Sequence, residues 1–148
     1  MTVEGPRWVN DDAAAHERLR RAALLAGLQD WFDVRFMAGV LEDLEPDLAP
    51  DDVQRIVIAT VRDMAAEGLV TIGSLDSKRT EVIAWSSEPV ESIERLDAEW
   101  DVLIDPKWRM GDPSLTLDGF LSNTEKGDDL ARWMRGTPES LRGAESPA

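Results

Sequence analysis

The chain of 148 residues has the length of a single domain, and its 43% apolar residues are sufficient for a hydrophobic core. It contains no cysteine, which excludes disulfides and thiolate chemistry, and no apolar run in it approaches the roughly 20 residues of a membrane span. The 30 Asp and Glu residues outnumber the 16 Lys and Arg residues, and the net charge of −14 repels nucleic acid and favours a basic partner.

The N-terminal half of the sequence predicts three helices. Residues 1–10 have little pattern and are expected to form a flexible arm, without the order of charged and apolar residues that marks a signal peptide, so we expect a cytoplasmic protein. Helices are predicted from Asp11 or Asp12 to Leu28, over 30–44 and over 50–67. The third begins with Pro50 and two aspartates, and its apolar stripe consists of Val53, Val57, Thr60, Val61 and Met64.

The second half predicts a hairpin followed by helices. Gly68 is expected to end the third helix in the left-handed conformation, and residues 69–75 and 80–85 read as strands joined by residues 76–79. Residues 86–104 predict one amphipathic helix with the apolar stripe Val90, Ile93, Leu96, Trp100 and Leu103. A short strand at 120–123, a last helix at 123–134 and a disordered tail over 136–148 complete the prediction.

Three helices, the run "AAEGLV" at residues 65–70 and the hairpin resemble the winged helix-turn-helix superfamily, especially its MarR- and PadR-like regulators. The segment "FLSNTEKGDDLARW" resembles the turn that follows the wing in those families. The resemblance implies an α+β domain of winged-helix type over residues 11–135, and it implies DNA binding by the third helix and the wing. It also makes residues 87–117 an insertion that lies beside the wing and covers or replaces its outer face.

A DNA-reading site would use Arg55 and Arg62 on the third helix with Lys78 and Arg79 at the tip of the hairpin, because arginine reads guanine in the major groove. Acidic residues surround these bases, and Arg55 has the spacing to pair with Asp51. Ile58, between the two arginines, is either a core residue or an interface residue.

The clustered acids suggest a different use of the same fold. Residues 42–52 hold six acids and no base, and residues 88–101 hold six acids with Arg95 as the only base. The second cluster would offer carboxylates to a basic protein, with these residues near the contact: Glu88, Glu91, Glu94, Asp97, Trp100 and Trp108. Residues 42–52 are a second candidate patch.

The sequence contains no motif for catalysis, metal binding or a cofactor. His16 is the only histidine and is expected at the surface. In the acidic run 42–52, Leu48 stands where a calcium loop needs glycine and Gln54 where it needs glutamate. A looser resemblance, in size, charge and lack of enzyme motifs, is to acidic immunity proteins of bacterial polymorphic toxin systems.

We therefore expect a non-catalytic, immunity- or antitoxin-like binder of a basic protein. A winged-helix transcription regulator, as a homodimer, is the alternative. Mutations at the two candidate sites distinguish these hypotheses, because each uses different residues.

Overall fold

The structure is a computed structural model that describes residues 5–28, 31–76, 78, 81–104 and 118–136, with the backbone alone at 5–13 and 118. Over these residues the chain is an α+β protein with six helices and a four-stranded antiparallel sheet. The predicted arm (1–4), tail (137–148) and much of the predicted insertion (105–117) lie outside the described residues. No helix in the described part is both long and apolar enough to cross a lipid bilayer.

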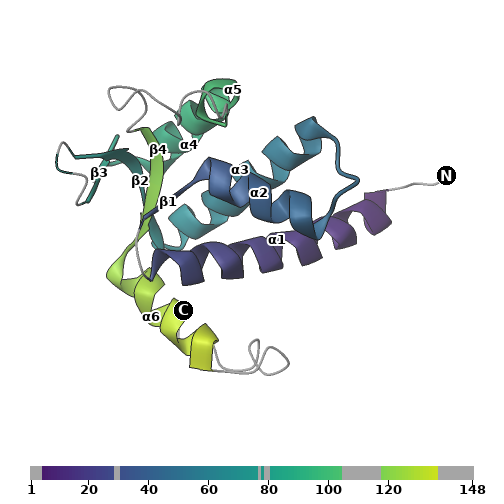
Figure 1. Ribbon diagram of the computed structural model, residues 1–148, viewed down its shortest axis with the longest axis horizontal. Helices are drawn as coiled ribbons and strands as arrows, with labels where there is room; N and C mark the ends of the chain where they lie inside the picture. Colours follow the sequence, from purple (N-terminus) through teal and green to yellow (C-terminus); the bar gives the residue numbers. More distant parts are fainter. Residues whose placement is uncertain (1–4, 29–30, 77, 79–80, 105–117, 137–148) are drawn as a thin grey trace.

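Helices α1 (Gly5–Gly27), α2 (Val34–Leu44) and α3 (Pro50–Ala66) pack against one another beside the sheet (Figure 1). Helix α1 begins six residues before the predicted start at Asp11, and Pro6 lies in its first turn, where proline has no amide hydrogen bond to lose. The predicted start was therefore wrong: Asp11 and Asp12 lie inside the helix.

The predicted second helix is shorter than expected, because Phe32–Asp33 form strand β1. Asp33 then caps α2: its Oδ1 accepts a hydrogen bond of 2.7 Å from the Phe36 amide. The cap satisfies an amide that the helix leaves without a partner, so α2 begins at Val34 instead of residue 30.

Helix α3 and the hairpin confirm the sequence prediction closely. Every residue of the predicted stripe of α3 is buried, and Gly68 has a φ of +76°. Strands β2 (Val70–Leu75) and β3 (Val82–Ala84) pair with Leu75 opposite Val82. Ile58 is 4% exposed and therefore belongs to the core.

Strand β4 (Asp118–Asn123) returns to the hairpin as predicted, but it pairs with β2 on the side opposite β3. The strand order is β1-β4-β2-β3, so Leu121 lies opposite both Ile72 and Phe32. The core between this sheet and the helices contains fully buried side chains from all of these layers, among them Leu19, Leu24, Met37, Leu41, Val57, Met64, Leu69, Leu96, Leu121 and Leu130.

The predicted single helix at 86–104 is divided into α4 (Pro89–Ala98) and α5 (Trp100–Leu103). Glu99, at φ −99° and ψ 10°, ends one helix and begins the next. The break places Trp100 and Leu103 in the core, at 4% exposure each. Burial of these two side chains explains why the bend is retained.

Helix α6 (Glu125–Gly136) is fixed to the junction of α3 and β2 by its first turn. The Thr124 hydroxyl donates to the Gly68 carbonyl oxygen at 2.6 Å and accepts a hydrogen bond of 3.1 Å from the Gly127 amide. The Thr124 amide donates to the Leu69 carbonyl oxygen at 2.9 Å. A side chain at Gly127 would collide with that Leu69 carbonyl group.

We expect Gly127→Ala to lower the free energy of unfolding by about 2 kcal/mol or more, because its methyl group would force α6 away from a backbone carbonyl. Gly39→Ala in α2 is the matched control: its methyl group meets no atom within 4 Å, and it should stabilise by about 0.5–1 kcal/mol. Urea unfolding measures both changes, and an unchanged midpoint for Gly127→Ala would contradict the tight contact.

Candidate functional site

Helix α4 packs its apolar side on α3 and turns its acidic side outward. Ser92, Ile93 and Leu96 are buried, whereas Glu88, Glu91, Glu94 and Asp97 are all exposed. Val90, predicted in the apolar stripe, is instead 67% exposed. The helix is rotated so that its buried arc extends toward Ser92, and Val90 then falls on the solvent side.

Two of the four carboxylates have partners within the protein. Glu91 accepts a hydrogen bond of 2.6 Å from the Ser86 hydroxyl, and the Oδ1 of Asp97 accepts one of 2.7 Å from the Gln54 amide. The same Gln54 nitrogen donates to the Asp97 carbonyl oxygen at 3.2 Å, which joins α4 to α3. These contacts fix two carboxylates in place.

The side chains of Glu88 and Glu94 have no hydrogen bond or ion pair to any residue that the structure describes. The single base of this segment, Arg95, is directed at Glu99, with 3.0 Å between its Nε and Oε2, and its guanidinium lies 3.8 Å from the centre of the Trp85 ring. Arg95 therefore compensates Glu99 instead of the outer carboxylates, and the outer face of α4 keeps a negative charge.

Of the two tryptophans predicted at this contact, the structure describes only Trp100. Trp100 is 4% exposed and belongs to the core, so it cannot touch a partner on the outer face of α4. Trp108 lies outside the described residues. Trp85 is half-buried instead, and its indole nitrogen donates to the Ser74 hydroxyl at 2.7 Å, which holds the end of β3 against β2.

Of the predicted DNA-reading residues on α3, Arg55 is half-buried and Arg62 is exposed. Arg55 pairs with Asp52 at 3.1 Å, an i,i+3 pair, instead of with Asp51. Arg62 and Lys78 are exposed, and Arg79 lies outside the described residues. Ala65 and Gln54 of the same helix face α4, so α4 lies along one side of the surface that a recognition helix would expose.

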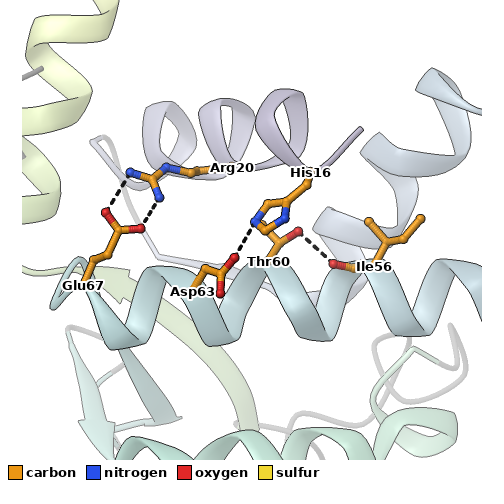
Figure 2. A network of polar contacts seen from close by, with 6 residues as sticks. All are labelled: His16, Arg20, Ile56, Thr60, Asp63 and Glu67. Carbon is orange, nitrogen blue, oxygen red and sulfur yellow. Dashed lines mark hydrogen bonds and ion pairs between the residues drawn. The ribbon is translucent and has the colours of Figure 1, made fainter. Parts of the chain in front are cut away.

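A second polar cluster lies between α1 and α3 (Figure 2). His16 Nε2 is 3.2 Å from Asp63 Oδ2, and Arg20 binds Glu67 with both guanidinium NH2 groups. His16, expected at the surface, is only 26% exposed at this helix interface. The Thr60 hydroxyl donates to the Ile56 carbonyl oxygen at 2.7 Å, so its proton is already engaged. The cluster aligns two helices.

Among the described residues, no group of three His, Asp or Glu side chains is arranged to hold a metal ion. The chain was compared with family models, curated proteins and solved structures, and none of them matches it. The functional argument therefore rests on the geometry of this chain alone.

Sequence reasoning missed three polar residues that shape the acidic face: Gln54, Ser86 and Ser92. Ser92 lies four residues before Leu96, a spacing that places it on the buried arc, so periodicity alone contained a signal for it. Nothing local to Gln54 or Ser86 indicates their partners, because each partner lies on another element or beyond a turn.

We expect Gln54→Ala to raise the hydrogen-exchange rates of the α4 amides about fivefold to tenfold, since it removes both hydrogen bonds between α3 and Asp97. Exchange in α1 should not change. Arg132→Ala, which removes an exposed ion pair on α6, is the control and should leave α4 unaffected. Equal exchange in wild type and Gln54→Ala would mean that α4 is held by its apolar contacts alone.

Proposed function

We propose that this protein is a non-catalytic interaction module that binds a basic protein through the outer face of α4, in the manner of an immunity protein or antitoxin. One observation carries the proposal: α4 uses its apolar side to pack on α3 and presents Glu88 and Glu94 to solvent without a compensating base among the described residues. These carboxylates are available to Lys and Arg of a partner.

Electrostatics favours this use of the surface. A net charge of −14 attracts basic proteins at long range, and exposed carboxylates on one helix give that attraction a direction. Glu91 and Asp97 are held by Ser86 and Gln54, so less side-chain freedom is lost there when a partner binds. The result is a partly preorganised acidic surface.

The proposal includes a winged-helix-like core. The order α1, β1, α2, α3, β2 agrees with that resemblance, and β4 leads into the Thr124–Gly127 turn that resembles the one after the wing. On this interpretation β2 and β3 form the wing, and the inserted residues 87–117, with α4 and α5 among them, lie between β3 and β4. The insertion then supplies the binding surface in place of DNA-reading elements.

A winged-helix DNA-binding regulator is the second candidate, favoured by the exposure of Arg62 and Lys78. Against it, Arg55 pairs with Asp52, and the acids of α4 lie beside α3, where they would repel a phosphate backbone. Homodimerisation belongs to this candidate.

We expect no binding of a labelled 20-base-pair duplex in fluorescence anisotropy at low salt, where phosphate attraction is strongest. Lys78→Glu should leave this result unchanged. Binding that is lost in Arg62→Glu and Lys78→Glu, and that weakens steeply with salt, would favour the regulator and overturn the proposal.

We expect Glu88→Lys with Glu94→Lys to reduce capture of basic proteins from a lysate of the source organism by fivefold or more. Both positions lack internal partners among the described residues, so the fold should be preserved. Quantitative mass spectrometry of proteins eluted by salt measures the change.

Asp43→Lys with Asp47→Lys is the matched control, because it changes the net charge equally in the other exposed acidic patch. It should retain the same partners. Equal losses in the two variants would indicate nonspecific attraction, and a loss confined to the control would move the site to residues 42–52.

A further inference from the structure

A small pocket opens beside the first turn of α4, where the chain leaves β3. It has a volume of about 120 Å³, and its lining comes from the end of α3, from β2, and from the segment between β3 and α4: Ala65, Val70, Thr71, Ile72, Ala84, Ser86, Pro89 and Ser92. Sites for drug-sized molecules measure roughly 300–1,000 Å³, so this pocket is too small for one and matches a single short side chain.

Ser92 contributes a hydroxyl group to the lining of the pocket. Ser92 is 3% exposed and lines the pocket. Its hydroxyl has no hydrogen bond to any residue that the structure describes. Because the pocket leaves this oxygen open to solvent, a polar group of a ligand can replace water there. The walls are mostly apolar, with Ala65, Ile72 and Pro89 among them.

The rim of the pocket is negatively charged. Ser86, which lines the pocket, donates its hydroxyl proton to Glu91 and accepts a hydrogen bond of 3.0 Å from the Glu88 amide. The Glu91 carboxylate and the backbone of Glu88 therefore lie next to the opening, while Arg95 is held against Trp85 and Glu99. Val90, next to Pro89 in the sequence, is exposed and adds apolar surface there.

We propose that this pocket receives a threonine side chain from a basic segment of the partner, with a lysine or arginine on either side of it facing Glu88 and Glu91. The threonine methyl group contacts the apolar walls and its hydroxyl pairs with Ser92. The inference rests on the proposed function, because it names the part of the partner that the acidic face recognises.

The probe is the peptide acetyl-Gly-Lys-Lys-Thr-Lys-Lys-Gly-amide, titrated into labelled protein and followed by amide chemical shifts. We expect shifts at Ser92, Thr71 and Ala84. Replacing the central threonine by glycine should weaken binding about fivefold, since it removes a buried methyl group and a hydrogen bond. Ala84→Leu, which fills the pocket from the exposed edge strand, should cause a similar loss.

Ala98→Leu is the matched control, because Ala98 is exposed on α4 and does not line the pocket. It should bind the peptide as the wild type does. Equal affinity for the threonine and glycine peptides, with both lost in Glu88→Lys plus Glu94→Lys, would overturn the pocket and leave the acidic face as the binding site. Absence of binding by either peptide, together with capture of basic proteins that charge reversal does not reduce, would overturn both.

Discussion

Helix α3 is packed against α1, α2 and α4, and the arrangement of the molecule follows from that burial. Eight of its 17 residues are buried, including Ile58, which lies between Arg55 and Arg62 in the sequence. Its C-terminus at Gly68 also receives the first turn of α6 through Thr124. Removal of this much apolar surface from water is the main stabilising contribution, and it fixes where the remaining polar surfaces can lie.

The polar edges of α3 are used within the protein. Asp63 and Glu67 meet His16 and Arg20 of α1, and Gln54 meets Asp97 of α4. Of the two arginines of α3, Arg55 is paired with Asp52, whereas Arg62 is exposed next to Asp63. We therefore place the proposed contact on the outward face of α4, where Glu88 and Glu94 are exposed, and not on α3.

Charge and shape have separate roles in the proposed surface. Exposed carboxylates such as Glu94 are well hydrated, so they steer association and exclude acidic partners more than they add affinity. The pocket lined by Ser92 would supply the local complementarity that charge lacks, because burying one side chain next to the Ser92 hydroxyl discriminates between ligands of similar charge. Such a surface would first attract basic partners through its negative charge. The shape of the pocket would then discriminate among them.

The sequence by itself determined the elements whose signals are local. Pro50 with two aspartates begins α3, Gly68 ends it, and the β2–β3 hairpin follows, so the acidic face of α4 could also be placed on a helix in advance. The tertiary structure alone decided that Phe32–Asp33 pair with β4, that the helix breaks at Glu99, and that Ser92 is buried while Val90 is not. The physical reason is that pairing and burial depend on which neighbour occupies each face, and those neighbours are distant along the chain.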